Sequence, residues 1–174
     1  MSEARLWHLI DDVEVAMLTT VDAHGQLRSR PLATIKVDGD DGDLWFFTAK
    51  DSPKVEQIQR EQHVNLAYAS PSRRTYVSVS GVATVTQDDS KLDELWSPAY
   101  RPWFPEGLRD PQLALLRVRV TGAQYWSDDS GWITMALGVA KAALSGERYA
   151  PGENEKLDVQ ARHHARMKRS LERS

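Results

Sequence analysis

The chain has 174 residues, of which 41% are hydrophobic and 27% charged, with a formal net charge of -3. This composition excludes a wholly disordered chain, and the small negative charge gives no reason to expect a nucleic acid or an acidic membrane as partner. The absence of cysteine excludes disulfides and cysteine-ligated metal sites and, with an N-terminus unlike a signal peptide, favours a cytoplasmic location.

The first half of the chain is predicted to begin with a helix and continue as strands. Leu6, Leu9 and Ile10 share one helical face, and Gly25 supplies the positive φ of a hairpin turn after the first strand. The predicted elements, in chain order, are a helix over 3–12, strands over 15–21, 27–37 and 44–48, and a helix that begins at 51–53.

The second half is predicted to hold three more strands. Its elements are strands over 64–70 and 75–86, a short helix over 88–96, a proline-rich irregular connection over 97–111, a strand over 113–127, and a helix over 135–144 that Gly146 ends. Six strands in mostly hairpin succession predict a mainly β fold with flanking helices, an antiparallel barrel or sandwich. We expect one domain over 1–147, followed by a polar helical tail over 148–174.

Standard catalytic signatures are missing from the sequence. It has no Walker-type phosphate loop, no dinucleotide-binding glycine fingerprint and no nucleophile elbow. His163 and His164 are adjacent in the tail, so on a helix their side chains diverge and do not form a shared metal site. We therefore assign no catalytic residue and no metal ligand.

One group of polar residues has the pattern of a phosphate receptor. Arg28 and Arg30 project to one face of a predicted strand, Thr48 ends the next strand, and Ser52 and Lys54 lie in the first turn of the following helix. A helix N-terminus with hydroxyl donors and fixed cations binds phosphate well. The alternative is a solvated basic face paired with the acids of the 38–43 turn.

At these residues the sequence resembles the pyridoxamine 5′-phosphate oxidase-like split-barrel flavoproteins, and more narrowly their bacterial general stress protein branch. The resemblance covers about residues 4–147 in the right order. It is carried by the segments 28–33 (RSRPLA), 44–48 (LWFFT), 51–54 (DSPK), 65–68 (NLAY), 76–83 (YVSVSGVA), 103–107 (WFPEG), 110–111 (DP) and 123–126 (AQYW).

The resemblance implies a six-stranded antiparallel split barrel that forms a homodimer, with FMN bound in the clefts between subunits. Carried over residue by residue, it places Arg30, Ser52 and Lys54 on the FMN phosphate and the Thr48 hydroxyl at the same site. The remaining positions that it assigns to the cofactor are Phe47, the segment Pro31, Leu32 and Ala33 with its backbone against the flavin ring, and Trp103 from the partner subunit.

The function implied is that of an FMN-binding general stress protein, with an FMN-dependent oxidoreductase of unknown substrate as the enzymatic version; FAD is a second candidate cofactor. The tail lacks the arginine and histidine spacing of the true oxidases, which argues against vitamin B6 oxidation. Two alternatives stay open: a split barrel that uses F420 or haem, and a non-enzymatic module whose basic tail binds an acidic partner. Acids among the cations of residues 153–174, and the absence of an aromatic residue in that segment, argue against nucleic acid.

Overall fold

The computed structural model describes residues 3–38, 42–127 and 153–158. Its helices and strands are α1 (Glu3–Asp11), β1 (Val15–Val21), β2 (Leu27–Ala33), β3 (Lys36–Asp38), β4 (Asp43–Ala49), α2 (Pro53–Arg60), β5 (His63–Ser70), β6 (Thr75–Thr86), α3 (Asp89–Leu95), β7 (Leu113–Ser127) and β8 (Glu153–Asp158). In these ranges no helix is long and apolar enough to cross a membrane.

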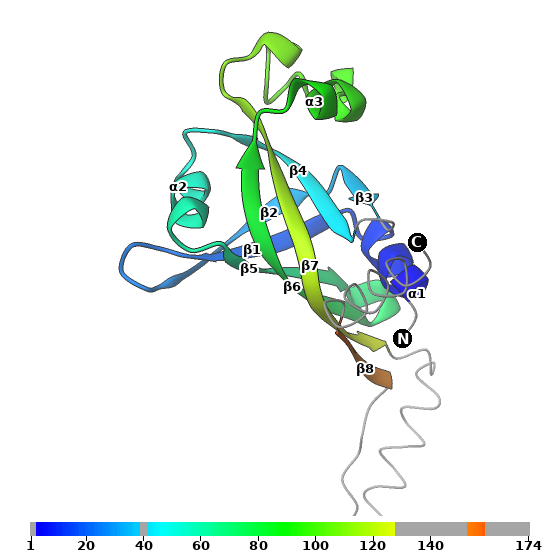
Figure 1. Ribbon diagram of the computed structural model, residues 1–174. Coiled ribbons are helices and arrows are strands. Elements are labelled where there is room, and N and C mark those ends of the chain that lie inside the picture. Colours follow the sequence, from blue (N-terminus) through cyan, green and yellow to red (C-terminus); the bar gives the residue numbers. More distant parts are fainter. Residues whose placement is uncertain (1–2, 39–41, 128–152, 159–174) are drawn as a thin grey trace, which may run out of the picture.

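The strands form one antiparallel sheet in the order β2-β1-β5-β6-β7-β4-β3. Figure 1 shows this sheet curled into a half-barrel, with α1 at one end and α2 on its flank. Each of the six predicted strand segments contains a strand, and β1, β6 and β7 have the predicted bounds. The prediction of a mainly β, antiparallel split barrel is therefore confirmed.

The curl of the sheet follows from the short connection between β2 and β3. These strands lie at opposite ends of the strand order, yet only Thr34 and Ile35 separate them. The Thr34 amide donates to Glu14 O beside β1 at 2.7 Å, whereas the Ile35 amide donates to Trp45 O of β4 at 2.8 Å. The prediction of a single strand over 27–37 is therefore wrong, because consecutive amides bond to opposite ends of the sheet and bring those ends together.

Strand β4 is buried on both faces, which explains its continuous apolar sequence. Leu44 and Phe46 point into the barrel core, where α1 adds Leu6 and Ile10. On the other face, Trp45 and Phe47 join a second core with α3 and the connection that follows it; its other buried members are Leu92, Leu95, Phe104, Leu113 and Leu115.

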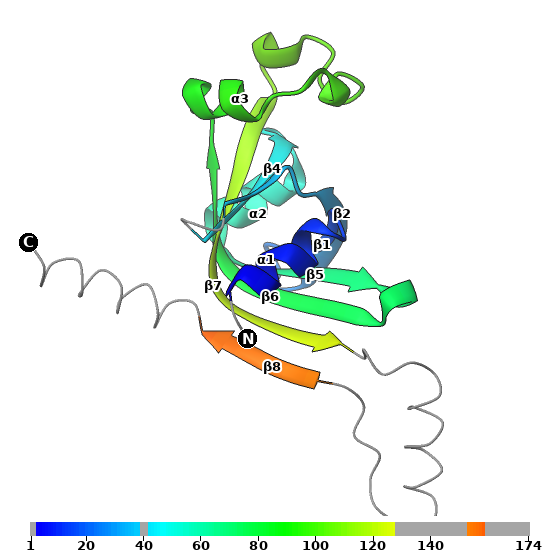
Figure 2. The same cartoon turned by 90° about the vertical axis from the view of Figure 1, so that its right-hand side faces the viewer.

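The proline-rich connection is irregular, as predicted, and contains two short 3₁₀ helices, Pro98–Tyr100 and Gly107–Arg109. With α3 it forms a lobe that projects from the barrel beyond the ends of β6 and β7 (Figure 2). Phe47 anchors this lobe, since its ring lies 4.6 Å from the ring of Tyr100 in an edge-on contact and also contacts Trp96 and Phe104.

The predicted helical tail is wrong at Glu153–Asp158, which form β8. Strand β4 pairs with the first half of β7 only. The same edge of β7 is therefore open over Gly122–Ser127, and β8 pairs there. The predicted helix over 135–144, its end at Gly146, the domain boundary at 147 and the rest of the tail lie outside the described residues.

We expect Gly81→Ala to destabilise the fold by about 1–3 kcal/mol, because overpacking strains a well-packed core. A Cβ at Gly81 would lie 2.6 Å from Val118 Cγ1 and 2.7 Å from Arg119 O, at the register shift in the pairing of β6 with β7. Urea unfolding measures the loss. The neighbouring Ser80→Ala is the control, and equal stability of the two variants would contradict the prediction.

Candidate functional site

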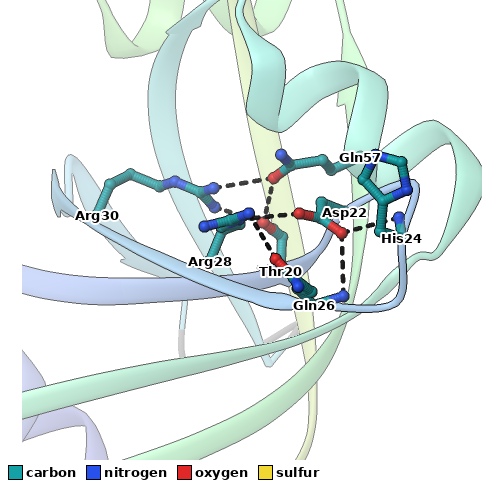
Figure 3. A network of polar contacts seen from close by, with 7 residues as sticks. All are labelled: Thr20, Asp22, His24, Gln26, Arg28, Arg30 and Gln57. Carbon is teal, nitrogen blue, oxygen red and sulfur yellow. Dashed lines mark hydrogen bonds and ion pairs between the residues drawn. The ribbon is translucent and has the colours of Figure 1, made fainter.

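Arg30 is held in place by a hydrogen-bond network that joins three elements. Its guanidinium donates from Nη1 to Thr20 Oγ1 on β1 and from Nη2 to Gln57 Oε1 on α2, the latter at 2.9 Å. Thr20 Oγ1 also donates to the same Gln57 oxygen, at 2.6 Å. Figure 3 shows Arg30 reaching from β2 to Gln57 across Thr20. These neutral partners orient the guanidinium without removing its charge.

Lys54 lies in the first turn of α2, near Arg30 of β2. Both side chains are partly buried. Burial lowers the pKa of Lys54, and the nearby positive charge of Arg30 lowers it further; burial also lowers the pKa of Arg30. Among the described residues, neither cation forms an ion pair with a carboxylate. Two partly desolvated cations without an acid between them are suited to bind an anion.

Hydroxyl groups lie beside Arg30 and Lys54, and we call this group of residues at the start of α2 the phosphate corner, after the predicted phosphate receptor. Thr48 is buried at the end of β4, and its Oγ1 lies 3.4 Å from Ser52 Oγ, immediately before α2. Ser52 occupies the N-cap position, but its side chain makes no capping hydrogen bond to the helix. Pro53 has no N–H and the Val55 amide donates to Ser52 O, so the Ser52 hydroxyl and the Lys54 amide remain for a ligand, and the helix dipole adds to the positive potential.

The free edge of β2 lies next to this corner. The Thr34 amide donates toward Glu14, so the antiparallel alternation directs the Leu32 amide toward β1 and the Ala33 amide away from it. The backbone of Pro31 also faces away from β1, so its missing N–H costs no hydrogen bond between the strands. The Leu32 side chain packs against the barrel core, whereas Pro31 and Ala33 are exposed. The edge thus offers the Ala33 amide and the Pro31 carbonyl to a ligand.

The two remaining predicted positions lie elsewhere. Phe47 points to the face of β4 opposite Thr48, into the second core, so only its backbone faces the corner. Trp103 is 72% exposed on the lobe. Neither side chain joins the Arg30 network within one subunit.

Arg28 does not belong to the site, contrary to the grouping that strand alternation suggested. Its Nε donates to Asp22 Oδ2 at 2.8 Å and its Nη2 to Gln26 Oε1 at 2.7 Å. The hairpin turn therefore neutralises Arg28 (Figure 3). The alternative of a basic face paired with the acids of the 38–43 turn is wrong for Arg28, whose acid is Asp22, and Asp43 pairs with Arg117 instead.

Sequence reasoning missed Thr20 and Gln57. A signal for each was present: the hairpin register places Thr20 opposite Arg28, diagonal to Arg30, and Gln57 lies one helical turn after Lys54. In the part of the chain that the structure describes, no three histidine or acidic side chains gather as metal ligands.

Comparison with known proteins identifies relatives. Residues 2–150 match the family described as pyridoxamine 5′-phosphate oxidase like. The chain is 26% identical over 141 residues to protein bli-3 of Neurospora crassa, covering 76% of this chain and 68% of that protein.

Solved structures give the same result. A general stress protein 26 from Jannaschia sp. CCS1 has a TM-score of 0.68 and 26% identity, over 89% of this chain and 96% of that chain. A general stress FMN/FAD binding protein from Xanthomonas citri has a TM-score of 0.65 and 30% identity, over 74% of this chain and 90% of that chain.

The hairpin turn beside the site yields a pH prediction. Hydrogen bonds, first from the Gln26 amide and then from Arg28, lower the pKa of Asp22 to about 2. Because the pKa of Asp22 is lower in the folded protein, its ionised carboxylate stabilises the fold at pH values above its ordinary pKa near 4. This stabilisation is lost as the pH falls through about 2. We expect Asp22→Asn to be less stable than the wild type at pH 7, with the difference shrinking between about pH 4 and pH 2. Denaturant unfolding across this range measures it, and a difference independent of pH would contradict the assignment.

Proposed function

The chain belongs to the pyridoxamine 5′-phosphate oxidase-like family, and from this premise we propose that it binds FMN by its phosphate at Arg30 and Lys54. The observation that carries the proposal is the pair of partly buried cations beside the first turn of α2, with no carboxylate between them among the described residues. A phosphate bound there would offset the repulsion of the cations and the cost of their burial. The description of the Xanthomonas citri protein as FMN/FAD binding supports the same cofactor class.

The donors are numerous enough for useful affinity. Arg30, Lys54, the Ser52 hydroxyl and the Thr48 hydroxyl can all reach toward one anion at the start of α2. Charge-assisted hydrogen bonds contribute roughly 1.5–3 kcal/mol each, and micromolar binding requires about 8 kcal/mol. Three or four such contacts supply a large part of that energy, and the flavin ring supplies the rest by burial.

The flavin ring would lie along the outer edge of β2. The Ala33 amide and the Pro31 carbonyl face outward there and can pair with the polar edge of the ring, next to the phosphate corner. When bound, the flavin supplies the electron-transfer chemistry of an oxidoreductase. The residues of this chain bind and orient it, and the Arg30 corner adds no carboxylate or histidine as an acid or base.

The second part of the proposal is a homodimer. His63, which pairs with Glu61, lies at the margin of the outer face on β5. The rest of the outer face of β2, β1, β5 and β6 carries no charged residue; its outward positions include Ser29, Pro31, Ala33, Val15, Met17, Thr19, Asn65, Ala67, Ala69, Tyr76, Ser78 and Ser80. We call this the uncharged face. Val15, Met17 and Tyr76 are each more than 40% exposed on it. An uncharged surface that spans four strands and exposes large apolar side chains is typical of a protein interface.

A second copy of this chain suits the uncharged face for two reasons. The face is continuous with Pro31 and Ala33, so a partner packed there would also cover the ring side of the flavin. The partner would also bring its own lobe, whose Trp103 is 72% exposed and does not join the Arg30 network of its own subunit. We therefore propose that Trp103 of each subunit packs near the flavin bound by the other.

Replacing Arg30 and Lys54 tests the phosphate site. We expect Arg30→Ala to weaken FMN binding about 10- to 100-fold, because one charged hydrogen-bond donor is lost, and the double variant with Lys54→Ala to retain no FMN after desalting. Quenching of FMN fluorescence measures the affinity, and circular dichroism verifies folding.

Arg28→Ala is the matched control, since Arg28 lies on the same strand but is paired with Asp22. Undiminished FMN binding by the folded double variant would contradict the phosphate site. If the wild-type protein binds F420 or haem but no FMN, the proposed cofactor is wrong, whereas the description of the fold is unaffected.

Met17→Lys tests the dimer. Met17 lies between Pro31 and Ala67 near the centre of the uncharged face, so a buried lysine there would lose its hydration without a counter-charge. We expect a monomer with weakened flavin binding, whereas Gln59→Lys on the exposed side of α2 remains dimeric. Sedimentation velocity at micromolar concentration distinguishes the two, and a dimeric Met17→Lys would exclude this face as the interface.

A further inference from the structure

A recess, which we call the hairpin hollow, adjoins the group of Arg30, Ser52 and Lys54 on the side of the β1–β2 hairpin turn. It lies between the β1–β2 turn and α2 and has a volume of about 160 Å³. Its lining residues are Asp22, Ala23, His24, Pro53, Glu56, Gln57 and Arg60. Two of them connect it to the site already described: Gln57 accepts from Arg30, and Pro53 lies between Ser52 and Lys54.

The three parts of the site follow one another along β2. The outward groups of Pro31 and Ala33 lie at the end of the strand, and Arg30 precedes them. In the opposite direction the strand returns to Leu27 and the hairpin turn, where the hollow begins. A flavin with its ring at Ala33 and its phosphate at Arg30 therefore directs any group on the far side of that phosphate toward the hairpin hollow.

The size and charge of the hollow limit what it can hold. Its volume is below the roughly 300–1,000 Å³ of pockets that enclose a whole ligand, so it fits one ring system and not a separate substrate. Its charges are already paired, because Arg60 Nη2 lies 2.8 Å from Glu56 Oε1 and Arg28 neutralises Asp22. A further anion gains nothing there, whereas a neutral polar ring avoids desolvating an unpaired charge.

The walls of the hollow are preformed and offer groups for such a ring. Asp22 Oδ1 accepts from the amides of His24 and Gln26, both at 2.9 Å, which fixes the turn. Gln57 uses its oxygen for Thr20 and Arg30, and its Nε2 makes no hydrogen bond among the described residues. The imidazole of His24 and the guanidinium of Arg60 are planar groups on which a base can stack.

We propose that the hairpin hollow is the subsite for the adenosine of FAD, so that this chain binds FAD more tightly than FMN. The inference rests on the proposed flavin site and extends it past the phosphate. The pyrophosphate would cross the start of α2 between Arg30 and Lys54, and the adenine would lie against His24 and Arg60 with Gln57 Nε2 as a donor. No bond is made or broken in this step.

The experiment compares the dissociation constants of FMN and FAD by fluorescence titration of the full chain. We expect the wild type to bind FAD about tenfold more tightly than FMN, the gain of one stacked and hydrogen-bonded base. Ala23→Trp fills the hollow and should abolish this preference while leaving FMN affinity unchanged. Gln59→Trp, on the exposed side of α2, is the matched control and should keep the preference.

The outcomes separate the two proposals. FMN binding with no preference for FAD, or a preference that Ala23→Trp leaves intact in a folded protein, overturns the adenosine subsite and leaves the phosphate site standing. Failure to bind either flavin overturns both. Should Ala23→Trp not fold, His24→Ala replaces it, with a several-fold fall in FAD affinity as the supporting result and unchanged affinity as the contrary one.

Discussion

The two-residue connection between β2 and β3 is the constraint on which the rest of the structure depends. Thr34 and Ile35 bond to strands at opposite ends of the sheet, so the sheet must curl until those ends meet. Tyr68 secures the crossing from inside the core, where its hydroxyl lies 3.0 Å from Thr34 Oγ1. The closure fixes β2 as a free edge beside β4, and every part of the candidate site lies at that edge or around it.

The same closure explains why α2 meets β2. Helix α2 begins directly after β4 and inserts Val55 and Ile58 into the protein interior, so its first turn is held at the end of the barrel. Gln57 then faces β1 and β2 and accepts from Arg30 and Thr20. The cations are therefore positioned by core packing before any ligand binds, which reduces the entropy lost on binding.

Local sequence patterns predicted the parts of this arrangement but not their contacts. Strand alternation and turn residues located β1, β6 and β7, and the chemistry of the residues grouped Arg28, Arg30, Thr48, Ser52 and Lys54 as a phosphate receptor, with a solvated basic face as the alternative. Alternation could not separate Arg28 from Arg30, because both project to one face and only the conformation of the turn gives Arg28 its partner, Asp22. The break at Thr34 and the strand β8 depend on which sheet edge is free, a property of the whole fold that no local pattern contains.

The proposed flavin site and the proposed dimer interface adjoin each other. In a single subunit the corner at Arg30 is closed by α2, but the outward edge at Ala33 and the uncharged face beside it have no cover among the described residues. A partner that packs on this face would shield the flavin ring, and the ring would in turn add apolar area to the interface. Two binding events that share a surface in this way are thermodynamically coupled, and each must strengthen the other by the same factor. Under the proposed function, the uncharged face and the unpaired cations would be two halves of one site, in which the cations provide affinity for the phosphate and the partner subunit excludes water from the ring.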